Sequence, residues 1–104
     1  MTSCFKESEK LVGISNFLAW KGMINIVLEV NEVINHVNGN ISKPYEDQSL
    51  FEYMEKYLKA QNILKESIKY SLIPHVAKLE TSKDIYDNMI EIFSRKYNNK
   101  YHIT

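Results

Sequence analysis

The chain has 104 residues, of which 44% are apolar and 25% charged, and its 13 basic residues balance its 13 acidic ones. This length fits one domain with one core, and the apolar content at zero net charge excludes an intrinsically disordered chain. The charge balance also weakens the case for a basic nucleic-acid-binding domain, because affinity for phosphates comes mainly from Lys and Arg. We therefore expect a single domain over residues 1–104, ordered from about 10 to 98 with frayed ends.

The cysteine content and the N-terminus bear on where the chain works. Cys4 is the single cysteine, which excludes an internal disulfide and a cysteine-based zinc cluster and favours a reducing compartment. No apolar run approaches the roughly 18 residues of a membrane span, and the first residues carry charge where a signal peptide is hydrophobic. The expected location is intracellular, cytoplasmic by default with the nucleus left open, and no membrane is expected as a partner.

The first predicted helix covers residues 15–30. It starts with capping residues, and at 100° per residue its apolar side chains cover more than half of the circumference. Its coherent polar strip is short: Lys21, Gly22, Asn25 and Glu29. A helix this apolar usually packs against neighbours on more than one side, so we expect it to be central in the fold.

A break near Asn31 separates this helix from a short helical turn within residues 32–37, which the sequence Asn38-Gly39-Asn40 stops. A loop then leads to the longest pattern, a helix from about Asp47 to Ser71. Its apolar residues fall within half of the helical circle and predict one core-facing stripe: Leu50, Phe51, Tyr53, Met54, Tyr57, Leu58, Leu64, Ile68 and Leu72.

Two large side chains, Ile63 and Tyr70, project from the opposite, charged face of this predicted helix. One interpretation is that the following segment folds back and covers them. The other is that they contribute to a surface that binds a partner protein. They are the sequence's best candidates for partner-binding residues.

Pro74 cannot continue the long helix and predicts a short one over residues 74–79. A start signal at residues 81–84 then precedes a further apolar stripe: Ile85, Tyr86, Met89, Ile90, Phe93 and Tyr97. The pair Asn98-Asn99 is expected to close this last helix, with the remaining residues frayed. Together the patterns predict an all-α fold, a compact bundle of about five helical segments.

The sequence offers little for catalysis or metal binding. His36, His75 and His102 lack the spacing of a zinc site, and the isolated glycines exclude a phosphate-binding loop. No serine lies in the context of a nucleophile elbow, and Cys4 lies in a terminal segment. We expect no enzymatic activity, no catalytic or metal-ligating residue, no cofactor and no small-molecule substrate.

The most basic stretch lies near the C-terminus, where cationic and aromatic residues are interleaved: Arg95, Lys96, Tyr97, Lys100 and Tyr101. Aromatic side chains flanked by cations form stacking platforms for single-stranded nucleic acid. Four of the seven tyrosines fall on predicted core stripes, so core packing is the stronger interpretation of the tyrosines as a group. RNA binding through this stretch is the alternative function.

Several motifs follow one another in a specific order along the chain: residues 10–21 with Gly13, Phe17 and Trp20, residues 60–68, residues 72–76, and residues 81–87 with Phe93. In order and spacing they resemble the Gag polypeptide of plant copia-type LTR retrotransposons over residues 10–97. The resemblance implies a helical domain like the N-terminal domain of a capsid. It also implies that Phe17 and Trp20 anchor the first helix to the core.

In function, the resemblance implies a non-enzymatic module that self-associates into a shell, with itself or related Gag proteins as partners. The sequence departs from the family at Val33-Ile34, where a Leu-Trp pair is common. It also lacks the family's further capsid helices and the Cys/His zinc knuckle, which is the part that binds RNA in the family. An excised or truncated Gag-derived chain is therefore expected. A natural short form would interfere with assembly of intact Gag or, after capture by a host, bind a host protein.

Overall fold

The computed structural model describes residues 5–101, so the expectations about Cys4 and residues 102–104 lie outside the described residues. This part of the chain holds four α-helices: α1 (Phe17–Val30), α2 (Ile34–Val37), α3 (Asp47–Glu66) and α4 (Ser82–Tyr101). Three short 3-10 helices accompany them: η1 (Glu7–Glu9), η2 (Ile14–Asn16) and η3 (Tyr70–His75). Apart from one isolated bridge, the described residues contain no strand. The predicted all-α fold is confirmed.

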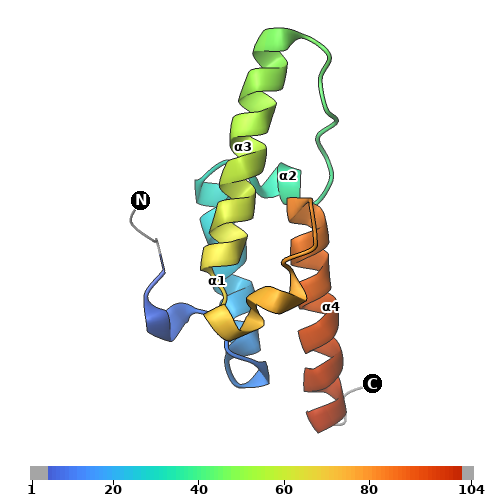
Figure 1. Cartoon of the computed structure of the whole chain (residues 1–104). Coiled ribbons are helices and arrows are strands. Elements are labelled where there is room, and N and C mark those ends of the chain that lie inside the picture. Colours follow the sequence, from blue (N-terminus) through green and yellow to red (C-terminus); the bar gives the residue numbers. More distant parts are fainter. Residues whose placement is uncertain (1–4, 102–104) are drawn as a thin grey trace.

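The helices pack around one core. α4 contacts α1, α2 and α3, and α1 lies behind the lower half of α3 in the view of Figure 1. The core consists of one cluster of buried apolar side chains: Phe5, Leu11, Phe17, Trp20, Ile24, Leu28, Val33, Val37, Ala60, Ile63, Leu64, Ile68, Val76, Ile85, Met89 and Phe93. The stripe predicted on the last helix faces this cluster, and the core extends at the N-terminus to Phe5, beyond the expected limit of residue 10.

α1 supplies four of the largest buried side chains, spaced three or four residues apart: Phe17, Trp20, Ile24 and Leu28. The ring centroid of Phe17 lies 6.3 Å from that of Trp20 and 6.1 Å from that of Phe93 on α4. Phe17 and Trp20 therefore anchor α1 to the core, as expected. This spacing places all four side chains on one face of the helix.

α1 packs against α2, α3 and α4, as expected for a central helix, but its circumference is not covered completely. On the face opposite its buried side chains, Leu18, Ile26 and Val30 are exposed. An apolar helix is thus left with one face open to solvent.

The end of α3 differs from the prediction because the N-terminal segment pairs with it. The backbone N–H of Leu11 donates to the carbonyl oxygen of Ser67 (2.9 Å), and that of Lys69 donates to the carbonyl oxygen of Leu11 (3.0 Å). The Ser67 hydroxyl also donates to the carbonyl oxygen of Leu64 (2.6 Å). α3 therefore ends at Glu66, about five residues earlier than predicted, and the chain continues in extended form.

The short helix predicted over residues 74–79 is also displaced. The chain forms η3 at Tyr70–His75 instead, with Pro74 inside it. Once residues 67–69 are held against Leu11, the next helical turn starts before the proline, and a short 3-10 segment loses only one hydrogen bond to it. Val76 then returns the chain to the core.

The turn between α2 and α3 follows the prediction. The helix ends with a hydrogen bond from the Asn38 N–H to the carbonyl oxygen of Ile34 (3.1 Å), and Gly39 adopts a φ of 79°. That left-handed conformation suits glycine because it has no Cβ. A Cβ at Gly39 would also lie 3.1 Å from the side chain of Lys83.

α4 starts and ends with side-chain contacts. The Thr81 hydroxyl oxygen accepts a hydrogen bond from the Asp84 N–H (3.0 Å), which is the predicted cap. The helix does not stop at Asn98-Asn99 but continues to Tyr101. The rings of Tyr97 and Tyr101, one turn apart, lie 4.6 Å from each other and support this last turn.

The N-terminal half of α3 does not face the core, contrary to prediction. In Figure 1 it rises beyond α1, α2 and α4, and the connecting loop of residues 38–46 runs beside it. Phe51, Met54 and Leu58, predicted as core, are exposed. Residues 5–101 contain no further helix that covers them, and the projection contributes to an elongated molecule of 49 × 32 × 25 Å.

The two faces of α1 predict effects of different size for the same substitution. Leu28→Ala should lower the free energy of unfolding by about 2–5 kcal/mol, because Leu28 is fully buried and its loss leaves a cavity. Leu18→Ala, on the exposed face, should change it by less than about 1 kcal/mol. Urea unfolding at low protein concentration measures both, and equal effects would contradict the described packing.

Candidate functional site

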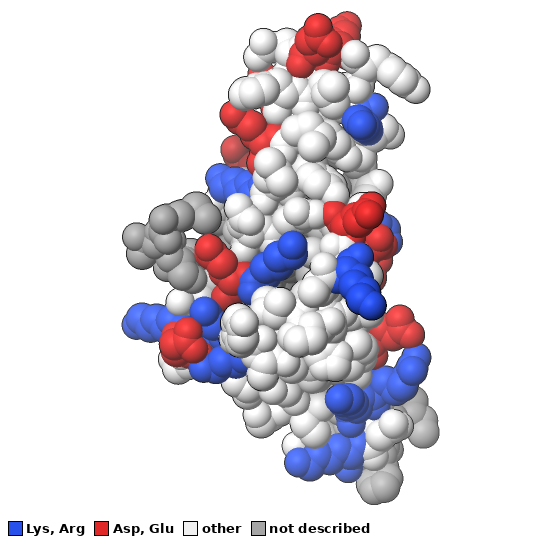
Figure 2. Space-filling view, in the orientation of Figure 1, with Lys and Arg blue, Asp and Glu red and all other residues white. Residues whose placement is uncertain are grey.

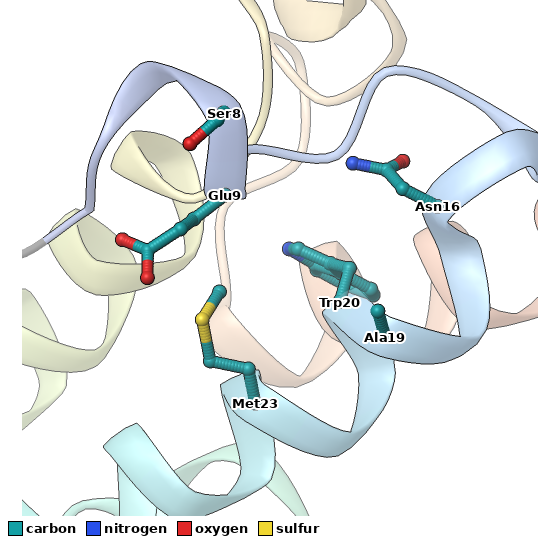
Figure 3. A pocket seen from close by; sticks show the side chains of 6 residues that line it. All are labelled: Ser8, Glu9, Asn16, Ala19, Trp20 and Met23. Atoms are coloured by element: carbon teal, nitrogen blue, oxygen red, sulfur yellow. The ribbon is translucent and has the colours of Figure 1, made fainter.

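A shallow hollow of about 180 Å³ lies between η1 and the first half of α1 (Figure 3). It is lined by Ser8, Glu9, Asn16, Ala19, Trp20 and Met23. The indole Nε1 of Trp20 is buried, has no hydrogen-bond partner, and faces into the hollow. A water molecule or a carbonyl oxygen placed there would satisfy this donor.

The polar groups around the hollow are mostly engaged within the chain. The Asn16 amide donates to the carbonyl oxygen of Lys10 (2.8 Å) and accepts from the Val12 N–H (3.1 Å). The Glu9 carboxylate accepts from the Lys6 N–H (2.8 Å). No nucleophile paired with a base lines the hollow. Within residues 5–101, no group of three or more His, Cys, Asp and Glu side chains could hold a metal ion.

The two partner-binding candidates from the sequence do not form one surface. Ile63 is only 7% exposed and belongs to the core. Tyr70 is 89% exposed and lies on η3. The early end of α3 separates them, because Tyr70 is not on that helix at all. Tyr70 alone stays available to a partner.

The basic and aromatic residues of the alternative function gather at the C-terminal end of α4. Figure 2 shows Lys and Arg side chains around this end of the molecule and acidic ones around the N-terminal end of α3. Arg95 pairs with Glu91 (2.8 Å), while the Lys100 ammonium lies 5.7 Å from the ring centroid of Tyr101. Lys96 similarly lies over the Phe93 ring (5.6 Å). These contacts within the helix occupy much of what a nucleic acid would use.

One solvent-facing apolar strip is the α1 outward face, which we define by Leu18, Gly22, Ile26 and Val30. These residues are spaced by four, so they follow one another along the helix. Leu18 is 55% exposed and Ile26 62%. The sequence carried only part of the signal for this face: the apolar side chains cover more than half of the circumference, more than one core-facing side needs, but Gly22 falls in the predicted polar strip.

Gly22 lies in the middle of this face and has no packing role within the chain. A Cβ built there would meet no atom within 4 Å. Glycine in the interior of a helix costs roughly 0.5–1 kcal/mol relative to alanine. Contacts within the single chain do not explain this cost. Close approach of another molecule to the helix backbone at Gly22 would explain it.

The α1 outward face is open but has defined borders. On one side, the hollow separates it from η1. On the other side, the Tyr86 hydroxyl on α4 donates to the Asn25 side-chain oxygen (2.7 Å), and burial raises the pKa of Tyr86. The face is therefore a strip one helix wide.

A second apolar surface is the α3 projecting face, which we define by Phe51, Met54 and Leu58. Their spacing of three and four residues places them on one side of α3. Phe51 is 62% exposed, and Tyr45, in the preceding loop, is fully exposed. Exposed apolar side chains gathered on one side of a helix make these two faces candidate binding surfaces.

Below the α3 projecting face, an aromatic column joins α3 to α2 and α4. The ring of His36 lies 5.2 Å from that of Tyr53, which lies 6.3 Å from that of Tyr57. The Tyr57 hydroxyl donates to the carbonyl oxygen of Glu80, just before α4. Both ring nitrogens of His36 are buried without a partner. Burial, and secondarily the charge of Lys56, lower the pKa of His36.

Comparison of the chain with models of known protein families, with curated proteins and with solved structures found no match. No helix among the described residues is both long and apolar enough to cross a membrane.

The lowered pKa of His36 predicts a pH dependence of stability. An unfolded chain binds a proton at the ordinary histidine pKa, whereas the folded chain binds it only at lower pH, so protonation favours unfolding. The free energy of unfolding should fall as the pH drops from about 7 to 5. In His36→Phe, which keeps a ring beside Tyr53, this fall should be smaller. Urea titrations at both pH values measure it, and an unchanged fall would refute the assignment.

Proposed function

We propose that this chain is a non-enzymatic protein–protein interaction module that self-associates inside the cell. The main evidence is a pair of exposed apolar surfaces, the α1 outward face and the α3 projecting face. Burial of such surfaces between protein copies is the main favourable term in association. Two different surfaces on one chain permit an assembly larger than a dimer, because several weak contacts then act together.

The resemblance of residues 10–97 to copia-type Gag supports this proposal, since a capsid domain works by contacts between copies. The all-α bundle is compatible with such a domain, although many unrelated proteins share that architecture. A related Gag protein is then a second partner. A short form that offers one surface and lacks the rest of the capsid would terminate an assembly of intact Gag, and a host-captured form would use the same surfaces on a host protein.

The alternative function is binding of single-stranded RNA at the C-terminal end of α4. It is favoured by the exposed ammonium groups of Lys96 and Lys100 next to the half-exposed ring of Tyr101. Binding of this kind depends on phosphate neutralisation and falls steeply with salt. Absence of binding to an RNA oligonucleotide at low salt would dismiss it.

Self-association predicts a molecular mass that rises with protein concentration. Phe51→Asp should weaken the larger species about tenfold or more, because a charge on the α3 projecting face would be buried unpaired. Glu52→Ala, an exposed change on the same helix outside this face, should have little effect. Size-exclusion chromatography with light scattering measures all three chains. A strict monomer for the unmodified chain at every concentration would contradict the proposal.

A further inference from the structure

We propose that the α1 outward face binds the same face of a second copy of this chain, with the two helices antiparallel and a two-fold axis passing through Gly22. This inference rests on the proposed function and specifies the partner and the register of one of its surfaces. It makes the contact isologous, so each residue before Gly22 meets the equivalent residue after it on the partner.

The first support is the symmetry of the sequence about Gly22. Residues four and seven positions away in either direction lie on the same side of a helix as the central residue. In α1 and η2 these positions hold Leu18 and Ile26 at four, and Ser15 and Glu29 at seven, and all four are exposed. A two-fold axis at Gly22 therefore places Leu18 against Ile26 of the partner subunit, and the symmetry repeats this contact on the other side of the axis.

The second support is charge complementarity. Neither η2 nor the first turn of α1 contains an acidic residue, and the last turn of α1 contains no basic one. Glu29 instead lies near the C-terminal end of α1, where the helix dipole disfavours a negative charge. In the antiparallel pair, Glu29 lies beside Ser15 and the positive N-terminal end of the partner's helix. The pairing thus turns an unfavourable charge into a favourable one.

The third support is the central glycine itself. Helices pack 8–10 Å apart when ordinary side chains separate them, and a residue without a Cβ at the crossing point lets the backbones come closer. No atom of this chain lies within 4 Å of a Cβ built at Gly22, so the space above it is free for the partner. A single pair of helices buries less than a standard interface, so the dimer should be weak, with a dissociation constant of roughly 1 μM to 1 mM.

Cysteine cross-linking of the full chain tests the register. Cys4 is first changed to Ser, because it is the only native cysteine. Gly22→Cys should then form a disulfide-linked dimer under mild oxidation, since the axis brings the two copies of residue 22 together. Ser15→Cys alone and Glu29→Cys alone should not cross-link, because their like copies lie about 21 Å apart, well beyond the roughly 7 Å limit of a disulfide. An equimolar mixture of these two variants should cross-link.

The other patterns of cross-linking overturn the proposal. Disulfides in Ser15→Cys alone and Glu29→Cys alone would mean a parallel pair. No disulfide in any sample, while the unmodified chain still forms dimers by light scattering, would place the contact on another surface and leave the proposed function standing. If the unmodified chain is monomeric at every concentration and no variant cross-links, both the α1 contact and the proposed self-association are wrong.

Opposite charges across the pair give an independent test without oxidation. Leu18→Glu and Ile26→Lys each place a charge in an apolar contact of the proposed dimer, so each variant alone should lose at least tenfold in dimer affinity. In a mixture of the two variants, the axis places the introduced charges opposite each other and keeps one Leu18–Ile26 contact, so the dimer should recover as a heterodimer. Circular dichroism should show both variants folded, since both sites are exposed. Failure of the mixture to recover while each variant is folded would contradict the two-fold axis.

Discussion

The burial of one face of α1 is the interaction on which the rest of the structure depends. Phe17, Trp20 and Leu28 are buried in the same cluster as residues of α3 and α4, and burial of large apolar side chains is the main favourable term for a small core. This contact does not bury all apolar side chains of the helix, because Leu18, Ile26 and Val30 stay exposed. The fold therefore produces a stable domain and, by the same arrangement, an open apolar strip on the opposite side of α1.

The sequence predicts the elements that local patterns determine. The start of α4, with its cap at Thr81, and the stop at Gly39 follow from side-chain and backbone preferences of a few residues. The end of α3 could not be predicted in this way, because it depends on Leu11, more than fifty residues earlier, pairing with the backbone at Ser67. Helical periodicity continues through Ile68 regardless, and only the three-dimensional contact ends the helix.

The exposed surfaces likewise depend partly on local patterns and partly on three-dimensional contacts. Helical periodicity identifies which side of α3 is apolar, but not that Phe51 lies beyond the reach of the other helices. It likewise placed Ile63 on the charged side, although the close packing at the lower end of α3 buries it. For α1, the sequence indicates an apolar surface larger than one core contact needs, but it places Gly22 in the polar strip and so does not identify the α1 outward face. Periodicity alone does not show whether an apolar helix face is covered by other helices of the chain or by a partner.

The role of α1 as both core helix and contact surface is tested most directly by a dilution series in two-dimensional ¹⁵N NMR. The chain has three glycines, whose amide signals fall in a sparse region of the spectrum, and Gly22 is the one on the α1 outward face. The symmetric dimer predicts that the Gly22 signal shifts with protein concentration while those of Gly13 and Gly39 stay nearly fixed. A Gly22 signal that does not move, in samples whose mass rises with concentration, would contradict the pairing.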